Sequence, residues 1–543
     1  MKASNLLVRC LEEEGVQYVF ALPGEENLDL LESLRTSKIK LIITRHEQAA
    51  AFMAATYGRL TRRAGVVLTT LGPGATNLLT GLAYATMGGM PLVAITGAKP
   101  IKQSKQGLFQ KVEIVEIMQP VTKMSRRIAM SSKIPVLVRR AFRNAQSERA
   151  GAVLLELPED IAKEEVKEQP LLPIKTAFPI PAHSCIEEAA KFIEKAKHPV
   201  IVIGSDTVRT HIFDPLSAFI TKTKIPFSTT QMGKGVIDET NECYLGTTAL
   251  SQNDYLHLAL EHADVILAIG HNIREKPPFL PTERKQSLIH INFTEADISQ
   301  IYQPEVEVIG DIGVALTLLT KRLTPQASWD FSYFHKVQKI LAEHLREEES
   351  QPKRFPSSPQ AIIAALKKSV PTNAVLALDN GMYKIWLTRN FPARWHHHII
   401  LDNALASMGA GLPSAIAAKL VYPNRPVIAM CGDGGFMMNS QELETAKRLG
   451  LDLTILILTD NAYGMIKWKQ EEMKLPDFGL DFGNPDFVKL AESYGIEGYR
   501  MQKNDTIDEI LAAHIQKEGL KLIEIPIDYS ENFTLTQTLK GKL

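Results

Sequence analysis

The sequence predicts an α/β protein built from three doubly wound parallel-sheet domains. Short apolar runs typical of buried strands alternate with longer segments that have helical apolar spacing. Glycine-rich turns follow several of these runs, at the strand ends where open α/β sheets bind ligands. The chain has 543 residues, which is too long for one hydrophobic core and fits roughly three domains of 150 to 200 residues.

The composition favours a globular protein that acts on a small molecule. Hydrophobic residues make up 45% of the chain, and the net charge is zero with dispersed basic residues, so no nucleic-acid footprint is present. The four cysteines lie far apart without Cys-x-x-Cys spacing, which argues against a disulfide framework or a zinc site and favours the reduced cytoplasm. No run approaches the ~18 apolar residues of a membrane span, and the amino terminus lacks a signal-like run. We therefore expect a soluble cytoplasmic protein without membrane or nucleic-acid partners.

The first predicted domain covers residues 1–165. Strands are expected at Val16–Leu22, Leu41–Thr44, Val66–Thr70, Leu92–Thr96 and Ala152–Leu157. Helices are expected at Asn5–Glu14, Leu28–Leu34, the alanine-rich segment through Arg59, and Ala75–Ala85. A proline-rich linker, Gln169–Pro181, follows.

The second predicted domain covers residues 185–345 and is Rossmann-like. A helix is expected at Ile186–Ala196, and strands at Val200–Ile203, Val265–Ile269 and Leu288–Ile291. No G-x-G-x-x-G motif is present, so the sequence does not support nucleotide binding. The charged segment Leu345–Pro359 is most simply a solvated connector.

The third predicted domain covers residues 357–543 and contains the most informative stretch. A helix is expected at Gln360–Lys368, and strands at Val375–Leu378, Val427–Cys431 and Leu453–Thr459. His396, His397 and His398 are expected at the surface, because consecutive residues of a strand point to alternate faces and make a poor metal site.

Polar residues follow two of these strands. Gly432-Asp433-Gly434-Gly435 ends the first, and Asp460-Asn461 ends the second. Taken alone, the glycine-rich segment is most often a tight strand-to-helix turn. However, glycines allow close backbone approach to a phosphate, and a carboxylate and an amide oxygen suit Mg²⁺. We expect a metal between Asp433 and an anionic ligand.

Gly-Asp-Gly followed about thirty residues later by Asp-Asn resembles the motif of thiamine diphosphate enzymes. Gly464-Met465-Ile466 is similar to the acetohydroxyacid synthase branch of that family. The resemblance implies that Mg²⁺ is bound by Asp433, the Asn461 side chain and the Tyr463 carbonyl. It also implies cofactor contacts from Gly432, Gly434, Gly435, Asn461, Tyr463, Gly464 and Met465, with Met465 in the catalytic site as well.

Glu47 is the strongest catalytic candidate. A glutamate before an apolar helix is usually a solvated charge favoured by the helix dipole. However, the segment Arg45 to Ala54, RHEQAAAFMA, resembles the family signature that holds the catalytic glutamate. By that resemblance, Glu47 binds N1′ of the aminopyrimidine and favours the tautomer that takes the proton from C2 of the thiazolium.

Further cofactor contacts follow from the same resemblance. The loop Gly72 to Asn77 matches the pyrimidine-domain loop, and Gly72 and Asn77 are expected to contact the cofactor. Pro23 and Gly24 are expected to contact it next to the thiazolium ring. Asn380 and Gly381 follow a strand and are expected at the diphosphate. Met408, in Met-Gly-Ala-Gly-Leu-Pro, matches the methionine that wedges between the two cofactor rings, although an isolated methionine is usually core filler.

Three candidates bear on the substrate. Phe109 and Gln110 match active-site residues of the synthases, although Lys111 replaces the usual acidic residue and a core position is the alternative for Phe109. Glu25 stands where the synthases have glycine or alanine and related decarboxylases have aspartate. It is either a helix-start charge or a proton-handling group that influences the product.

The resemblance covers nearly the whole chain and implies an acetolactate synthase with thiamine diphosphate and Mg²⁺. It would decarboxylate pyruvate and ligate the enamine to a second pyruvate, giving 2-acetolactate and CO₂. Gly270 to Glu275 replaces the Arg-Phe-Asp-Asp-Arg run of FAD-containing relatives, so FAD is not expected. A homodimer or homotetramer with active sites at the subunit interface is implied. The alternative is a 2-oxo acid decarboxylase, or another carboligase, on the same cofactor.

Overall fold

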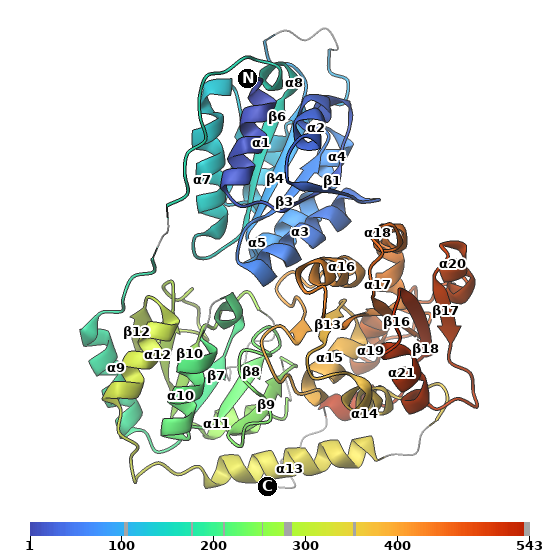
Figure 1. Ribbon diagram of the computed structural model, residues 1–543. Helices are drawn as coiled ribbons and strands as arrows, with labels where there is room; N and C mark the ends of the chain where they lie inside the picture. Colours follow the sequence, from blue (N-terminus) through green and yellow to red (C-terminus); the bar gives the residue numbers. More distant parts are fainter. Residues whose placement is uncertain are drawn as a thin grey trace. The chain divides into compact units, whose positions relative to one another are not determined.

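The structure is a computed structural model that describes residues 1–102, 107–174, 177–209, 212–251, 254–275, 285–350 and 354–536 (Figure 1). It contains three six-stranded sheets, and all strand pairs assigned within them are parallel. The predicted α/β class with three doubly wound parallel sheets is confirmed. The chain forms two compact units: residues 1–176, 404–424 and 436–453 make unit 1, and residues 177–403, 425–435 and 454–543 make unit 2.

The first sheet belongs to unit 1 and has the strand order β2-β1-β3-β4-β6-β5. Its strands are β1 (Tyr18–Leu22), β2 (Lys40–Ile43), β3 (Gly65–Thr69), β4 (Leu92–Ala98), β5 (Met124–Arg127) and β6 (Ala152–Pro158). The helices in this segment are α1 (Ala3–Glu13), α2 (Leu28–Arg35), α3 (Glu47–Thr61), α4 (Pro73–Thr76), α5 (Leu79–Met87), α6 (Ile114–Met118), α7 (Ile134–Gln146) and α8 (Glu159–Ala162). Figure 1 shows α1 and α7 on one face of the sheet and α3 and α5 on the other. Both faces are covered, which explains the continuous apolar runs of β3, β4 and β6.

Two expectations for this segment need correction. The helix expected at Ala75–Ala85 is two helices, α4 and α5, and Asn77 is the C-cap of α4. Strand β5 was not predicted, because its sequence Met-Ser-Arg-Arg has no apolar run and it lies at the edge of the sheet.

Helix α3 is buried on every side. Residues Ala49 to Ala55 are completely inaccessible to solvent, because small alanine side chains allow neighbouring elements to approach closely. On its far side α3 packs against α16 (Gly411–Val421), where the hydroxyls of Thr56 and Ser414 lie 3.0 Å apart. Residues far apart in the sequence therefore form one core in unit 1.

The second sheet belongs to unit 2 and has the order β12-β11-β10-β7-β8-β9. Its strands are β7 (Pro199–Ile203), β8 (Phe227–Thr230), β9 (Tyr244–Thr248), β10 (Val265–Ile269), β11 (Ser287–Asn292) and β12 (Val306–Ile309). The helices are α9 (His183–Lys195), α10 (Phe213–Thr223), α11 (His257–His262), α12 (Ile312–Arg322) and α13 (Ser332–Glu349). Strands β8 and β9 were not predicted, since their serine and threonine residues break the apolar pattern.

Helix α13 corrects the prediction of a solvated connector after residue 345. The charged residues up to Glu349 form its last turn. Glu349 makes an ion pair with Lys367, and Glu348 lies 3.4 Å from His344 within the helix. The charge run therefore ends a helix instead of forming a free linker.

The third sheet also belongs to unit 2 and has the order β14-β13-β15-β16-β18-β17. Its strands are β13 (Val375–Leu378), β14 (Ile399–Ile400), β15 (Val427–Gly432), β16 (Thr454–Thr459), β17 (Glu497–Arg500) and β18 (Lys521–Pro526). The other helices of this part of the chain are α14 (Pro359–Ser369), α15 (Met382–Asn390), α17 (Asp433–Met438), α18 (Glu442–Arg448), α19 (Gly464–Glu472), α20 (Phe487–Ser493) and α21 (Ile507–Ile515).

The expected surface position of the three consecutive histidines is wrong for two of them. His397 and His398 are buried just before β14, and His396 is half-buried. Burial, together with the nearby charge of Lys234, lowers the pKa of His398 to about 4. The His398 ring is therefore a neutral group in the core, and no cluster of three or more His, Cys, Asp or Glu suited to a metal occurs in the described part of the chain.

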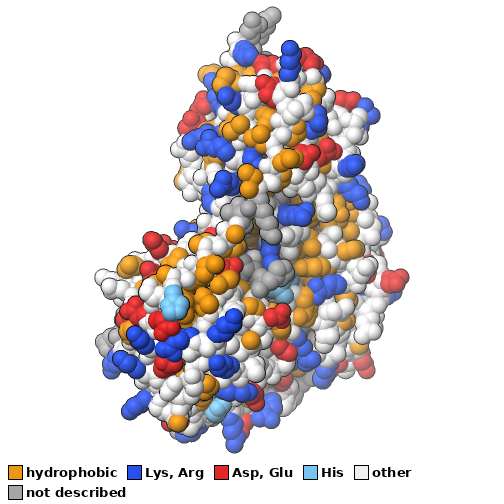
Figure 2. Space-filling model, turned by 60° about the vertical axis from the view of Figure 1, so that its left-hand side comes forward, with side chains coloured by type: hydrophobic (Ala, Val, Ile, Leu, Met, Phe, Trp, Pro, Cys, Tyr) orange, Lys and Arg blue, Asp and Glu red, His pale blue; other side chains and the backbone are white. Residues whose placement is uncertain are grey.

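The surface carries mixed charges. On the face drawn in Figure 2, basic and acidic side chains are interspersed. Among the helices that the structure describes, none has the length and apolar character needed to cross a membrane.

Gly58 gives a test of the packing around α3. A Cβ at this position would lie 2.1 Å from the carbonyl oxygen of Pro91, which already accepts the backbone N–H of Gly65. Glycine-to-alanine changes inside helices usually stabilise by ~0.5–1 kcal/mol. Here we expect the opposite sign, a loss of about 2 kcal/mol or more, because backbone must move.

Urea denaturation of Gly58→Ala measures this loss. Gly483→Ala is the matched control, because a Cβ there meets no atom within 4 Å. A Gly58→Ala protein as stable as the control would contradict the packing described for α3.

Candidate active site

The first sheet brings several polar side chains to the carboxyl ends of its strands. The strand order reverses between β1 and β3, which is the position where open α/β sheets bind ligands. Glu47 begins α3 directly after β2, and the side chain of His46 caps the helix by accepting the N–H of Gln48. Glu47 is thereby fixed at the ligand edge of the sheet.

The Glu47 carboxylate is buried and held from one side. Its side chain is 5% exposed, and its Oε2 accepts a hydrogen bond of 2.9 Å from the Asn77 amide. Gly74 lies beside the other oxygen, where a Cβ would be 3.2 Å from Oε1. The structure thus brings together two of the predicted residues, Glu47 and Asn77, and leaves no side chain at position 74 over the second carboxylate oxygen.

Sequence reasoning missed an ion pair at the same edge. Glu26 is buried, and its carboxylate accepts hydrogen bonds from Lys99 Nζ at 2.7 Å and Thr70 Oγ1 at 2.6 Å. Burial disfavours this carboxylate, but Lys99 and Thr70 outweigh it and lower the pKa of Glu26. Glu25, the predicted residue, is exposed. The sequence gave no sign that Glu26 is the buried one of the two glutamates, because its burial depends on the positions of Lys99 and Thr70.

The predicted glycines and the Phe109 segment meet at this edge. Pro23 and Gly24 are partly exposed after β1, and the Gly24 N–H donates to Asn27 Oδ1. Gly72 has φ +52°, and a Cβ on it would lie 2.9 Å from the Gln110 carbonyl oxygen. Gln110 and Phe109 are exposed, and Lys99 Nζ lies 5.6 Å from the Phe109 ring centroid.

Unit 1 also contains residues that follow Met408 and the glycine-rich turn. Asn439 donates to the Gln48 side chain at 3.1 Å and to the Gly409 carbonyl at 2.8 Å. Glu442 accepts the backbone N–H of Arg45 at 3.0 Å, and its burial raises its pKa. These bonds hold the residues on either side of Glu47, while Met408 itself is half-buried.

Asp433 and Asn461 lie together at the edge of the third sheet. Asp433 is buried directly after β15, and Asn461 follows β16. Asp433 Oδ2 accepts the backbone N–H of Asn461 at 2.8 Å, and Oδ1 accepts the N–H of Gly434 at 2.8 Å. Asn461 has φ +57°, a conformation that asparagine tolerates better than most residues. The predicted carboxylate and amide are therefore neighbours.

The donor set fits a divalent cation. Burial raises the pKa of Asp433, and burial followed by the charge of Asp433 raises that of Asp460 to about 7. Two acidic groups held close together in this way favour a positive ion between or beside them. Carboxylate and amide oxygens are the ligands that Mg²⁺ prefers.

The remaining predicted residues of this region surround the pair. Gly432 and Gly434 are partly exposed, and a Cβ on Gly435 would lie 3.0 Å from the Asp379 carboxylate. Tyr463 precedes α19, and its carbonyl accepts the N–H groups of Ile466 and Lys467. Gly464 and Met465 form the first turn of α19 and are partly exposed.

Lys384 is a second residue that sequence reasoning missed. It lies on α15, is 4% exposed, and donates to Asn380 Oδ1, to the Asp402 carbonyl at 3.0 Å and to Asn403 Oδ1 at 3.0 Å. Burial lowers its pKa to about 8. Lys384 therefore ties the predicted Asn380 to the loop that begins at Asn403. The sequence Met-Tyr-Lys-Ile-Trp gave no sign that this lysine is buried.

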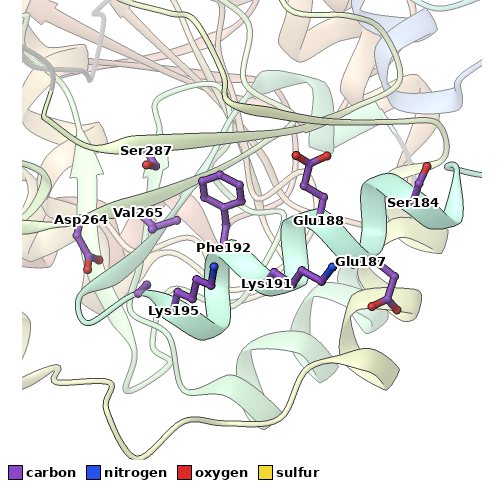
Figure 3. A pocket seen from close by; sticks show the side chains of 10 residues that line it. Ser184, Glu187, Glu188, Lys191, Phe192, Lys195, Asp264, Val265 and Ser287 are labelled. Atoms are coloured by element: carbon purple, nitrogen blue, oxygen red, sulfur yellow. The ribbon is translucent and has the colours of Figure 1, made fainter.

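A cavity of about 760 Å³ lies away from these edges. Figure 3 shows Glu187, Glu188, Lys191 and Lys195 of α9 along it, with Val265 and Ser287. Val265 and Ser287 begin β10 and β11, so this cavity lies at the amino ends of the strands. It is opposite the edge where α/β sheets bind ligands.

Three family models and several curated relatives match this chain. Residues 1–117 match the thiamine pyrophosphate enzyme N-terminal TPP binding domain, residues 186–319 the central domain, and residues 379–525 the C-terminal TPP binding domain. The chain is 33% identical to an acetolactate synthase of Bacillus subtilis, covering 98% of this chain and 94% of that protein. It is 32% identical to a catabolic acetolactate synthase of Raoultella terrigena, covering 97% and 95%.

A third relative is the acetolactate synthase isozyme 2 large subunit of Escherichia coli, 30% identical over 98% of this chain and 96% of that protein. Each of these relatives aligns over nearly its full length, and the three domain models occur in the order that the sheets follow in the structure. The resemblance drawn from the motifs is thereby confirmed. The chain belongs to the thiamine pyrophosphate enzymes and, among them, to the acetolactate synthase family.

Proposed function

We propose that this protein is an acetolactate synthase that uses thiamine diphosphate and Mg²⁺. It would decarboxylate pyruvate and join the remaining two-carbon unit to a second pyruvate, giving 2-acetolactate and CO₂. The observation that carries the proposal is the buried Glu47 carboxylate, held by Asn77 on one oxygen and beside Gly74 on the other. The names of the relatives support the same reaction.

The residues of the first domain would handle the proton that is exchanged with the aminopyrimidine of the cofactor. When bound, thiamine diphosphate supplies a stabilised carbanion and an electron sink for decarboxylation. Glu47 would hold a proton at N1′ of the aminopyrimidine. Asn77 fixes the orientation of the carboxylate by its hydrogen bond to Oε2. Burial excludes water from Glu47 and strengthens its interaction with a bound ring nitrogen.

The third domain would hold the other end of the cofactor. Asp433, Asn461 and the Tyr463 carbonyl would bind Mg²⁺. Gly434, Gly435 and Asn380 would border the diphosphate, and Lys384 would position Asn380 through their hydrogen bond. Met408 would support the ring system, while Phe109, Gln110 and Met465 would border the substrate.

FAD is not part of the proposal. The strand order of the second sheet reverses between β7 and β10, where a dinucleotide would bind. The loops after these strands are in contact, because a Cβ on Gly204 would lie 2.4 Å from His271 Cα. Glu275 accepts the Met232 N–H at 2.5 Å and the Thr230 hydroxyl at 2.7 Å. These contacts lie at the position where a dinucleotide would bind and support flavin-independent activity.

The proposed function includes the domain bounds, the oligomeric state and the cellular compartment of the protein. We propose three domains at residues 1–165, 185–345 and 357–543. We also propose a homodimer or homotetramer in which the first domain of one subunit and the third of another complete each site. None of the four cysteines, all of which lie in the described part of the chain, forms a disulfide, which is compatible with the cytoplasm.

Product analysis tests the proposed reaction directly. The purified protein is incubated with pyruvate, thiamine diphosphate and Mg²⁺, without flavin, and the products are separated and quantified. We expect acetolactate and CO₂ in equal amounts from two pyruvate molecules, and no flavin absorbance in the protein. Acetaldehyde as the main product would instead identify a decarboxylase. A strict need for FAD would contradict the flavin-independent activity proposed here.

Glu47→Gln should lower the turnover number about 10²-fold or more, because the amide cannot exchange a proton while it keeps the shape of the side chain. Cofactor affinity should stay near that of the unmodified protein. Steady-state kinetics and a cofactor titration measure the two effects. Glu13→Gln, at an exposed position, is the control. Unchanged turnover would remove Glu47 from the mechanism.

Asp433→Asn should weaken Mg²⁺ binding, because the metal loses a charged ligand. The expected defect is in assembly of the loaded enzyme, and excess Mg²⁺ and cofactor should rescue part of the activity. Calorimetric Mg²⁺ titration in the presence of cofactor measures the affinity. Asp481→Asn, an exposed acid in the same domain, should bind Mg²⁺ normally. Ordinary Mg²⁺ affinity in Asp433→Asn would mean that the metal lies elsewhere.

The decarboxylase alternative draws support from Glu25. Because Glu26 is engaged by Lys99 and Thr70, Glu25 is the carboxylate of this turn that faces solvent. A carboxyl group beside the cofactor could deliver a proton to the two-carbon unit and release aldehyde. Glu25→Ala should then change the ratio of acetaldehyde to acetolactate without weakening Mg²⁺ or cofactor binding. The same ratio and rate as the unmodified protein would make Glu25 a helix-start charge only.

A further inference from the structure

Asn484 lies directly against both proposed side-chain ligands of the metal. Its Nδ2 donates to Asp433 Oδ2 at 2.8 Å and to Asn461 Oδ1 at 2.9 Å. Its own Oδ1 is buried and has no hydrogen-bond partner among the described residues. A buried amide oxygen without a partner calls for an explanation, and a missing ion is one of the few available.

The backbone fixes Asn484 in this place. The segment from Leu480 to Asn484 runs beside the ligand loop: the Phe482 N–H donates to the Asn461 carbonyl, and the Tyr463 N–H donates to the Leu480 carbonyl, both at 3.1 Å. The rings of Tyr463 and Phe482 are in contact, with centroids 4.9 Å apart. Two residues beyond Asn484, the Asp486 side chain caps α20 by accepting the N–H groups of its first turn.

The two distances match those between neighbouring oxygens around Mg²⁺. Octahedral Mg²⁺ binds oxygen at 2.0–2.1 Å, so adjacent ligand oxygens lie about 2.9 Å apart. The two ends of an amide have nearly the same shape. A half-turn of the Asn484 amide places Oδ1 where Nδ2 stands, 2.8 Å from Asp433 Oδ2 and 2.9 Å from Asn461 Oδ1.

We propose that Asn484 is a third side-chain ligand of the divalent cation, beside Asp433 and Asn461. Without metal, its amide nitrogen bridges the two other ligands and keeps both oxygens within hydrogen-bond distance of one atom. With metal, Oδ1 faces the ion and completes the oxygen set together with the diphosphate. This inference rests on the proposed function, because it uses the same metal site.

The test measures metal binding instead of activity. Mg²⁺ is titrated by calorimetry into each protein with saturating thiamine diphosphate, and the free Mn²⁺ signal in electron paramagnetic resonance gives a second affinity. Asn484→Ala should weaken Mg²⁺ binding about 10- to 100-fold, the range expected when a metal site loses one well-placed partner. The control is Asn504→Ala, at an exposed position of the same domain, which should leave the affinity unchanged.

Asn484→Asp separates a ligand from a hydrogen-bond donor. A ligand role predicts that aspartate binds Mg²⁺ at least as tightly as asparagine, because it supplies a charged oxygen. A role only as N–H donor predicts weaker binding than in Asn484→Ala, because the new carboxylate repels Asp433 and cannot donate. Unchanged affinity in Asn484→Ala, or weaker binding in Asn484→Asp than in Asn484→Ala, would overturn the proposal.

Asp433→Asn, titrated in parallel, distinguishes this proposal from the proposed function. If Asp433→Asn weakens Mg²⁺ binding and Asn484→Ala does not, Asn484 is not a ligand but the metal site stands. If neither variant changes the affinity, the metal site itself is misassigned. Thermal unfolding of each variant confirms that the comparison is between folded proteins.

Discussion

A parallel sheet with helices on both faces leaves the ends of its strands as the places where polar groups can meet a ligand. All three sheets of this chain are of this kind. The central strands β3, β4, β15 and β16 are almost entirely apolar and buried, so a charged residue that follows such a strand begins at the edge of the core. Each of these charges loses hydration when it is buried, and a hydrogen-bond or charged partner has to offset that loss. The candidate site consists of these charged residues and the groups that pair with them.

The kinds of partner that these charged residues have differ between the two units. In unit 1, the Glu26 carboxylate accepts hydrogen bonds from a lysine and a hydroxyl, whereas the Glu47 carboxylate accepts one from the Asn77 amide. In unit 2, among the described residues, Asp433 accepts hydrogen bonds from N–H groups, and Lys384 donates to uncharged oxygens. Glu26 and Lys99 form an ion pair in which the charge of the carboxylate is already balanced. The groups with neutral partners are those in which a bound charge or proton would change the energy most.

Much of this arrangement could be predicted from the sequence. Long apolar runs such as Val427–Cys431 gave the central strands, because burial on both faces imposes that pattern. Edge strands such as β5 and polar strands such as β8 could not be found in this way, since their pairing depends on neighbours distant in sequence. Burial of His397 and His398 was missed for the same reason, since it depends on neighbours distant in the sequence, such as Lys234 beside His398.

The site shows the same division. Glu47, Asp433 and Asn461 stand in motifs whose order along the chain carries the information. Lys384 and Asn484 stand in segments without such a motif, and their importance comes from contacts with atoms many residues away. Local sequence gives the residue types and tertiary structure gives their partners.

The contact between the loops after β7 and β10 has a consequence for how this protein could change. Gly204 and Gly270 permit the loops to touch, since a Cβ on Gly204 would overlap His271, and one on Gly270 would lie 2.5 Å from Thr207 Cγ2. A molecule entering between the loops would have to separate packed backbone before gaining any contact of its own. Small changes at either glycine would disturb the domain before they created a useful opening. Single substitutions at Gly204 or Gly270 are therefore expected to lower the stability of the middle domain, because packed backbone has to move to admit a side chain.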